Sequence, residues 1–357
     1  MNDLFIKSSS HSYHIYIREN IRFNVNELLA KTYSSILIIT DENVAPLYLE
    51  DVKESLPSER VYTTIIPATE RSKGIQTYYQ VHTEAIQYGL DRESLIIALG
   101  GGVVGDLAGF VAATYMRGID YIQMPTTILA HDSSVGGKVA INHELGKNLI
   151  GNFYPPVAVV YDVQVLETVS EKEVRSGYAE LIKEALIADE SFFKSIMDTS
   201  LTSLTNEQLT THIRQGIAIK ATIVEQDERE ANTRKYLNLG HTLGHAIESE
   251  LGYGSITHGE AVAIGMLFAM RVSEQKYFIK LPDQELLEWL QNNNYPLQLG
   301  SINTNNLLNR MKSDKKAVSG KLQMVLLKDV GVPVIEEVSE DDLNLYLSSF
   351  TDELLNS

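Results

Sequence analysis

The sequence predicts an α/β fold, in which an N-terminal Rossmann-like domain precedes a mainly α-helical C-terminal domain. In the first half, short apolar runs bounded by turn residues alternate with helical patterns, which is typical of a parallel sheet covered on both faces. A glycine-rich turn follows one of the predicted strands, as it does in nucleotide-binding units. In the second half, almost every periodic segment is helical. The expected domains are residues 1–172 and 173–357.

The strands of the sheet are predicted from five short runs rich in β-branched residues. They lie at residues 35–40, 61–66, 94–99, 120–124 and 157–161. A helix is expected over residues 70–89. Ser170 and Glu173 have capping-box spacing, so another helix is predicted to begin there. Further helices are expected near residues 206–227, 241–251, 258–277, 283–292 and 341–355, with extended segments at 322–327 and 332–338.

Composition narrows the classes of function. The net charge of −17 argues against a nucleic-acid partner, because phosphate backbones require a basic face. No long apolar window and no basic start followed by an apolar run occur, so neither a membrane span nor a signal peptide is expected. The chain has no cysteine, which excludes disulfides and fits a cytoplasmic location. Any bound metal must therefore be held by histidines and carboxylates.

The glycine-rich turn G-G-G-V-V-G-D contains Gly100, Gly102 and Gly105 in G-x-G-x-x-G spacing. Glycines allow close backbone approach, and a following helix N-terminus presents free N–H groups, so we favour pyrophosphate binding over a plain tight turn. Two other strand ends carry polar residues. Asp41 to Asn43 form D-E-N, which suits a ribose or a simple turn equally well. Thr126 and Thr127 follow Pro125, where hydroxyls reach a cofactor or cap a helix.

A basic cluster stands out in this acidic chain. Residues 131–156 hold Lys138, Lys147 and Asn148 among glycines, in a stretch where polar residues punctuate apolar ones. Lysines in such a setting suit a phosphate, a carboxylate or sugar hydroxyls, whereas most lysines simply face solvent. Arg117 is a weaker candidate for the same role, because a surface ion pair explains it equally well.

The second half carries a candidate metal site. His241 and His245 are four residues apart on a predicted helix, so both imidazoles lie on one face. His258 follows within a short distance, and Glu180 and Lys183 share a face of an earlier helix. A catalytic zinc site without cysteine takes three such ligands and leaves one position open. Spacing alone does not decide which three of the four candidate ligands bind the metal.

Six blocks taken together resemble one known family. They are G-G-G-V-V-G-D, P-T-T-I-L-A-H-D-S-S-V-G-G-K, G-K-N-L-I-G-N-F-Y-P-P, G-Y-A-E-L-I-K, L-N-L-G-H-T-L-G-H-A-I-E and H-G-E-A-V. Their order, from about Asp41 to Lys316, is similar to that of the 3-dehydroquinate synthases, members of the sugar-phosphate cyclases. Glu144, Asn152 and Pro155 depart from the family pattern, at positions that are not catalytic.

The resemblance implies roles for individual residues. The metal ligands would be Glu180, His241 and His258, while His245 would assist proton transfer near the phosphate. The substrate pocket would be lined by Asp132, Lys138, Asn148, Lys183, Lys220, Arg234, Asn238 and a lysine of D-K-K, Lys315 or Lys316. Of these, Lys220 and Arg234 would grip a carboxylate. The residues that would contact NAD are Asp41, Asn43, Glu70, Lys73, Gly101, Gly102, Val103, Val104, Gly105, Asp106, Thr126, Thr127, Lys138, Lys147, Val165, Leu166, Glu167 and Thr168.

The resemblance also implies an activity. The family converts 3-deoxy-D-arabino-heptulosonate 7-phosphate to 3-dehydroquinate and phosphate in the shikimate pathway, through transient oxidation by NAD, phosphate elimination, re-reduction and aldol closure. A divalent metal, Zn²⁺ or Co²⁺, is expected, since both accept these ligands. A homodimer is expected as well, with Arg117 reaching across from the second subunit.

Three alternatives compete with this interpretation. Another sugar-phosphate cyclase, of the 2-deoxy-scyllo-inosose synthase type, shares fold, metal and NAD, but its substrate has no carboxylate for Lys220 and Arg234. A metal-dependent polyol dehydrogenase would release NADH and need fewer anion-binding residues. A nucleotide-binding regulatory protein without turnover would keep its activity after Glu180→Gln or His241→Ala.

Overall fold

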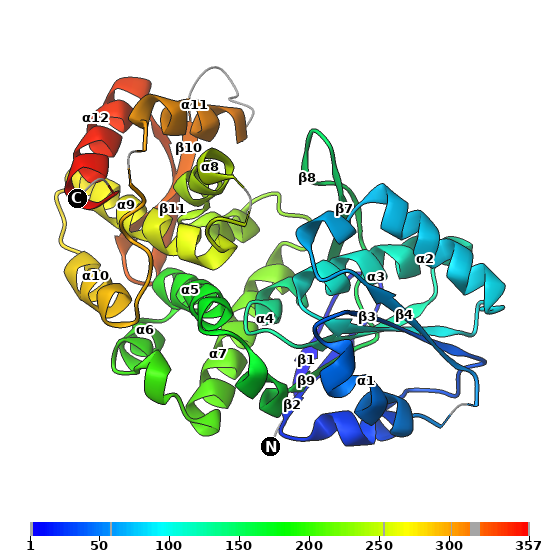
Figure 1. Ribbon diagram of the computed structural model, residues 1–357. Helices are drawn as coiled ribbons and strands as arrows, with labels where there is room; N and C mark the ends of the chain where they lie inside the picture. Colours follow the sequence, from blue (N-terminus) through cyan, green and yellow to red (C-terminus); the bar gives the residue numbers. More distant parts are fainter. Residues whose placement is uncertain (1–2, 58, 253, 301, 315–321, 356–357) are drawn as a thin grey trace. The chain divides into compact units, whose positions relative to one another are not determined.

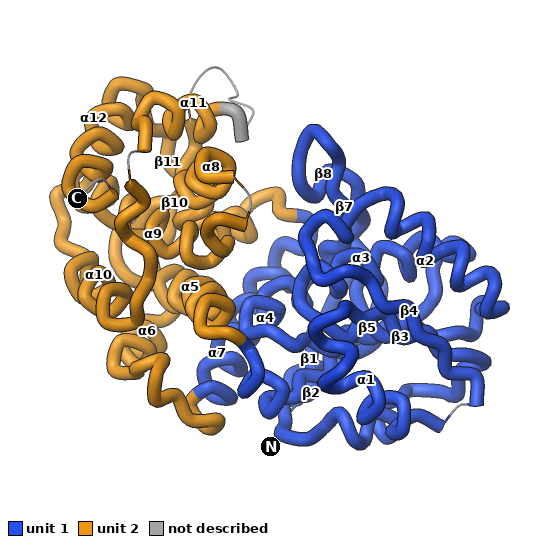
Figure 2. Tube along the Cα trace, viewed as in Figure 1, with its two compact units in different colours: residues 1–169, 209–229 blue, residues 170–208, 230–357 orange. Residues whose placement is uncertain are grey.

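The computed structural model describes residues 3–57, 59–252, 254–300, 302–314 and 322–355. The chain forms two compact units (Figure 2): unit 1 comprises residues 1–169 and 209–229, and unit 2 comprises residues 170–208 and 230–357. From the sequence we predicted a single domain boundary, after residue 172. The first division lies at Val169 and Ser170, three residues earlier, and residues 209–229 return to unit 1.

Unit 1 is built on a seven-stranded sheet with the order β1-β2-β9-β6-β5-β3-β4 (Figure 1). All neighbouring pairs are parallel except β1 with β2. The strands are β1 Leu4–Ile6, β2 Tyr13–Arg18, β3 Ile36–Asp41, β4 Val61–Ile66, β5 Leu95–Gly100, β6 Asp120–Pro125 and β9 Ala158–Asp162. The five predicted strands are confirmed as a parallel sheet. The sequence interpretation missed β1 and β2, although β2 alternates buried and outward-facing residues, as an edge-proximal strand should.

Helices of unit 1 connect these strands. They are α1 Ala45–Glu54, α2 Ile75–Gln87, α3 Gly102–Thr114 and α4 Ala130–Ser133, with 3-10 turns at Ile21–Leu28, Glu70–Ser72, Tyr115–Arg117 and Val163–Thr168. The single helix predicted over residues 70–89 was wrong, because Gly74 has an extended backbone and separates the turn from α2. This interruption places Lys73 between the two segments. Helix α3 is buried over most of its length, as expected for a helix packed against the sheet.

Residues 131–156 are more ordered than their polar, glycine-rich sequence suggested. They contain all but the first residue of α4 and an antiparallel ribbon made of β7 Lys138–His143 and β8 Gly146–Phe153. Gly151 is required by this pairing, because a Cβ there would lie 2.4 Å from the carbonyl oxygen of Val139 on the opposite strand. The glycines that looked like a ligand-binding feature therefore also have a structural role.

Unit 2 is mainly helical, as predicted. Its elements are α5 Glu171–Ala188, α6 Glu190–Met197, a 3-10 turn at Leu201–Ser203, α7 Asn206–Gln226 (which continues into unit 1), a 3-10 turn at Thr233–Asn238, α8 His241–Leu251, α9 His258–Tyr277, α10 Asp283–Asn292, α11 Thr304–Asp314, β10 Leu322–Asp329, β11 Val332–Val338, α12 Glu340–Phe350 and a π-helical turn at Thr351–Leu355. Helix α5 begins where predicted, but the side chain of Ser170 makes no capping hydrogen bond. A capping box occurs instead at the start of α9, between Thr257 and Glu260.

Candidate active site

The polar strand ends of unit 1 lie at one edge of its sheet. Strands β3, β5, β6 and β9 are parallel, so the segments that follow them leave from the same carboxyl edge. These segments are the turn after Asp41, the glycine turn, Thr126–Thr127 and the 3-10 turn Val163–Thr168. In open α/β sheets ligands bind outside the carboxyl ends of the strands. The expected NAD contacts in these four segments are thus gathered where a nucleotide site belongs, whereas Glu70, Lys73, Lys138 and Lys147 lie in other segments.

The glycine turn runs from β5 directly into α3, as predicted. Gly101 is the residue before the helix, and its hypothetical Cβ would lie 3.2 Å from the side chain of Thr127. The backbone N–H of Thr126 donates to the carbonyl of Gly100 at 3.1 Å. The structure therefore brings the threonines beside the turn, and α3 directs its first N–H groups to that side.

Lys73, which precedes α2, contacts residues of two other segments, α3 and the ribbon β7–β8. It is buried, and its Nζ lies 2.5 Å from Asp106 Oδ2 and 2.5 Å from Asn148 Oδ1. Asn142, which the sequence interpretation missed, donates from Nδ2 to Glu70 at 2.8 Å and accepts at Oδ1 from the backbone of Asn148. Burial raises the pKa of Asp106, while the charge of Lys73 opposes that rise.

Asp41 and the turn after β9 have local roles as well. One oxygen of Asp41, Oδ1, accepts backbone hydrogen bonds from Asn43 at 2.9 Å and Val44 at 3.0 Å. This is the turn-forming role that the sequence left open as an alternative to ribose binding. Tyr48 of α1 bonds to Thr168 Oγ1 at 2.7 Å and donates to the carbonyl of Val165, which fixes the segment after β9.

Other predicted residues of unit 1 are placed as follows. Lys220 Nζ lies 2.8 Å from Asp132 Oδ2, so these two are brought together. Lys138 begins β7 and Lys147 lies in β8. Arg117 is exposed and has φ 72°, directly after Met116 with φ 48°. Two successive non-glycine residues in the left-handed region are strained, and such strain is concentrated at functional segments.

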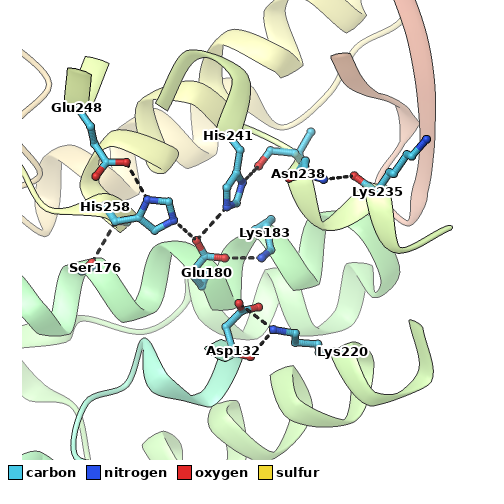
Figure 3. Close-up of polar contacts among 12 residues, drawn as sticks. Asp132, Ser176, Glu180, Lys183, Lys220, Lys235, Asn238, His241, Glu248 and His258 are labelled. Atoms are coloured by element: carbon cyan, nitrogen blue, oxygen red, sulfur yellow. Dashed lines mark hydrogen bonds and ion pairs between the residues drawn. The ribbon is translucent and has the colours of Figure 1, made fainter. Parts of the chain in front are cut away.

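In unit 2, Glu180 stands at the centre of a histidine cluster (Figure 3). Its Oε1 lies 3.4 Å from His258 Nε2 and 3.6 Å from His241 Nε2. Ligand atoms held about 2.1 Å from a tetrahedral ion are separated by roughly 3.4 Å, so these spacings fit three ligands of one ion. Glu180 comes from α5, His241 from α8 and His258 from α9, and the side chain of Glu180 is 2% exposed.

The other ring nitrogen of each histidine has its own partner. Nδ1 of His241 lies 3.2 Å from the carbonyl oxygen of Leu239, and Nδ1 of His258 lies 2.9 Å from Glu248 Oε2. Such outer partners fix the tautomer and leave Nε2 free to ligate. Both Nε2 atoms face Glu180, so the donor set and its orientation fit a divalent cation.

His245 lies in the same cluster. Ring atoms of His241, His245 and His258 that could bind a metal are all within 4.8 Å of one another. The ring centroid of His245 is 5.4 Å from that of His241 and 5.6 Å from that of His258. Proximity alone therefore admits either Glu180 or His245 as the third ligand, as the sequence spacing did.

The pKa values of the two histidines that face Glu180 are shifted in opposite directions. Burial, together with the charges of Lys183, His258 and His245, lowers the pKa of His241 to about 3 against the opposing effect of Glu180. Burial also lowers the pKa of His258, but hydrogen bonds and charges from Glu180 and Glu248 outweigh it and raise the value to about 10. Lys183 is buried and donates to Glu180 Oε2. Glu180 therefore has the ammonium group of Lys183 as a direct neighbour.

The helices that carry the ligands approach each other closely. A Cβ on Gly259 would lie 1.9 Å from the carbonyl oxygen of Ser176, and the N–H of Gly259 donates to Ser176 Oγ at 3.0 Å. Arg175 pairs with Glu260 at 2.8 Å across the same junction. Ser176 is one turn before Glu180 on α5. The junction therefore places His258 opposite Glu180.

The remaining substrate candidates of unit 2 are near the start of α8. Arg234 is 1% exposed, and Asn238 donates to Glu230 Oε1 and to the carbonyl of Lys235, each at 3.1 Å. Lys220 and Arg234, which were paired in the sequence interpretation, belong to different units. Lys315 and Lys316 lie outside the described residues.

Two family models match the chain over adjoining segments. The 3-dehydroquinate synthase N-terminal model covers residues 63–176 and the C-terminal model covers residues 177–317. The 3-dehydroquinate synthase of Oceanobacillus iheyensis is 54% identical over 356 residues, which is 99% of each chain. The chain belongs to the 3-dehydroquinate synthase family. This confirms the predicted family and the predicted activity, that of a carbon–oxygen lyase acting on a phosphate ester.

Solved structures agree with this fold. A 2-deoxy-scyllo-inosose synthase complexed with carbaglucose-6-phosphate, NAD⁺ and Co²⁺ superposes with a TM-score of 0.88 at 26% identity, covering 98% of this chain and 100% of that one. A 2-epi-5-epi-valiolone synthase from Streptomyces hygroscopicus subsp. jinggangensis, with NAD⁺ and Zn²⁺ bound, has a TM-score of 0.84 at 22% identity, covering 97% and 98%. The predicted fold class is confirmed. Across the described residues, no helix has the length and hydropathy that crossing a bilayer demands.

Proposed function

We propose that this 3-dehydroquinate synthase family member binds NAD at the carboxyl edge of its parallel sheet and a divalent cation, Zn²⁺ or Co²⁺, at Glu180, His241 and His258. The observation that carries the metal assignment is the position of Glu180 Oε1, 3.4 and 3.6 Å from two histidine Nε2 atoms. These spacings suit neighbouring ligands of one tetrahedral ion. Three protein ligands leave a coordination position for a substrate oxygen.

The reaction is the conversion of 3-deoxy-D-arabino-heptulosonate 7-phosphate to 3-dehydroquinate and phosphate. When bound, the dinucleotide takes up and returns a hydride, and the cation stabilises the negative charge that develops on the hydroxyl being oxidised. The chain's own residues supply the rest. Lys183 and Asp132 orient hydroxyl groups, and each is held in place by an ion pair, to Glu180 and Lys220 respectively.

Anionic parts of the substrate need fixed cations in an otherwise acidic protein. We assign Lys220 and Arg234 to the carboxylate, and both are buried, which strengthens their interaction with a charged group. We assign the phosphate to Lys138, Asn148, Asn238 and one of Lys315 and Lys316. His245 lies beside the metal ligands and is placed to move a proton near the departing phosphate.

The dinucleotide site follows from the same reasoning. The first turn of α3, with Gly101, Gly102, Val103, Val104 and Gly105, is assigned to the pyrophosphate. The remaining contacts are assigned to Asp41, Asn43, Glu70, Lys73, Asp106, Thr126, Thr127, Lys138, Lys147, Val165, Leu166, Glu167 and Thr168. Lys73, which is buried, already forms an ion pair with the half-buried Asp106 in this region.

The test is a phosphate-release assay on the heptulosonate phosphate, run with and without NAD⁺ and with and without a chelator. We expect phosphate release that needs both cofactors and no net NADH. NADH that accumulates one-for-one with substrate would support a polyol dehydrogenase instead. Phosphate release from a hexose phosphate without a carboxylate, but not from the heptulosonate phosphate, would support the inosose synthase alternative.

Two further assignments are part of the proposal. A homodimer in which Arg117 of one protomer reaches the site of its partner explains the strained, exposed backbone at Met116 and Arg117. Light scattering on the purified protein measures its mass, and a monomer that is fully active would reject the dimer. A cytoplasmic location suits a biosynthetic enzyme of this class, and cell fractionation tests it.

A further inference from the structure

Glu248 lies behind one of the metal ligands. It is on α8, three residues after His245 and seven after His241, so all three residues share one face of that helix. Its Oε2 is 2.9 Å from His258 Nδ1, and its side chain is 8% exposed. The family block L-N-L-G-H-T-L-G-H-A-I-E ends at this residue, but the sequence analysis assigned it no role.

We propose that Glu248 is a positioning residue for the metal site, which holds His258 in the tautomer and orientation that direct Nε2 toward the ion. This inference rests on the proposed metal site. A histidine that ligates a metal is neutral, and in neutral His258 Glu248 accepts a hydrogen bond from Nδ1–H, so the lone pair of the ring belongs to Nε2. The Nε2 atom is the one that lies 3.4 Å from Glu180 Oε1. A carboxylate, a histidine and a metal in this order form a triad that raises the basicity of the ligand.

The connectivity of the fold explains why such a residue is needed. His258 is the first residue of α9, and its side chain is 32% exposed, more than the 13% of His241. Because more of the His258 side chain is exposed to solvent, packing restricts its rotamer less than it restricts that of His241. His241 is fixed by a backbone carbonyl two residues before it. His258 instead depends on a carboxylate from a different helix, α8, which also carries His241.

The same helix supplies a matched control. Glu250 is two residues further along α8, and it bonds to Arg310 at 2.6 Å and Asn306 at 2.8 Å, away from His258. Neutralising Glu250 also removes one carboxylate charge from α8 and changes its contacts with Arg310 and Asn306. It leaves the hydrogen bond to His258 intact, so it separates the proposed role from a general effect on helix stability.

The experiment measures zinc affinity by competition with a chromogenic chelator, and the absorption spectrum of the Co²⁺-loaded protein. In E248Q an amide oxygen still accepts from Nδ1–H but the charge is lost, so we expect zinc to bind about 10-fold more weakly. In Glu248→Ala the partner is absent, and we expect a loss of about 100-fold and an altered Co²⁺ spectrum. Glu250→Gln should bind zinc as the unmodified protein does.

The outcomes separate this inference from the proposed function. If the unmodified protein neither binds zinc nor releases phosphate, the proposed function fails. If it does both, and Glu248→Ala and E248Q bind zinc with unchanged affinity, only the role of Glu248 is rejected. An equal loss in Glu250→Gln would also reject it, because the effect would then follow from any charge removed from α8. Should Glu248→Ala not fold, the isosteric E248Q decides alone.

Discussion

Replacing Gly259 with alanine should disrupt the metal site without touching any ligand. Gly259 follows His258 at the start of α9, where the backbones of α5 and α9 meet. An added Cβ would lie 1.9 Å from the carbonyl oxygen of Ser176, 2.5 Å from its carbonyl carbon and 2.6 Å from its Cα. All three contacting atoms are backbone, so no side-chain rotation relieves the clash.

The size of the effect follows from these distances. Ordinary contact begins near 3.4 Å, so from 1.9 Å the two helices must move apart by about 1.5 Å at this point. Metal ligands tolerate displacements of only about 0.2 Å. Since Glu180 is on α5 and His258 is on α9, we expect zinc affinity to fall by more than about 100-fold, beyond the loss typical of an outer partner. The overpacking itself should cost about 3 kcal/mol of unfolding free energy, the upper end for such changes.

The assay is zinc content after equilibration with limiting metal, together with thermal unfolding with and without zinc. A ligand that binds only the folded state raises the melting temperature, so the unmodified protein should melt higher with zinc. Gly259→Ala should melt lower, by roughly 4 °C if the 357-residue chain unfolds as one unit with an entropy of about 2.1 cal/mol/K per residue, and should gain little from zinc.

Ser176→Ala is the control for this prediction. It removes the hydroxyl that accepts from the N–H of Gly259 but adds no atom between the helices. We expect it to cost about 1 kcal/mol and to retain zinc. If Gly259→Ala retains full zinc content and the melting behaviour of the unmodified protein, the argument that backbone contact between α5 and α9 sets the metal geometry is refuted.

Three further predictions concern the site. Dialysis against a chelator should abolish phosphate release, and Zn²⁺ or Co²⁺ should restore it; activity that persists in metal-free protein contradicts the assignment. Glu180→Gln should lose zinc, whereas His245→Gln should keep zinc and release phosphate slowly, and the reverse pattern would make His245 the third ligand. Lys73→Met should lower the unfolding free energy by about 3 kcal/mol at neutral pH, because it leaves the half-buried Asp106 carboxylate without Lys73 as its partner. Since burial already raises the pKa of Asp106, the deficit should shrink as pH falls and that carboxyl is protonated, and urea titrations that show a pH-independent deficit would reject this cause.

The sequence predicted the parts of the fold that local patterns determine. Strand β5 is buried along its whole length and α9 is buried over most of its length, so their apolar residues mark both elements in the chain. The prediction was less accurate where the sequence pattern did not mark the start of an element or its buried face. Residues 70–89 have helical spacing throughout, and only the extended backbone at Gly74 shows that the helix starts later. The ribbon β7–β8 was missed because its β8 strand is exposed along most of its length and so lacks a buried face.

In the candidate site, too, sequence spacing could find some residues, while others depend on how distant segments pair. The cluster of His241, His245 and His258 was predicted from residue types and spacing, and the structure brings the three rings together. Glu248 could have been found by the same spacing rule, since it lies seven residues after His241. Asn142 could not, because its contacts with Glu70 and Asn148 depend on how the ribbon pairs and where it meets the turn before α2.

One helix face cannot by itself settle which histidines bind the metal. His241 and His245 are a turn apart on α8, and that spacing suggests a pair of ligands. The geometry favours a different pair, because His241 and His258 each have Nδ1 bound to an outer partner and Nε2 within 3.6 Å of Glu180. The face of α8 then provides a ligand at its first turn and an outer partner, Glu248, two turns later. The ion is thus expected to join three helices, and its removal should loosen the contacts among α5, α8 and α9 rather than α8 alone.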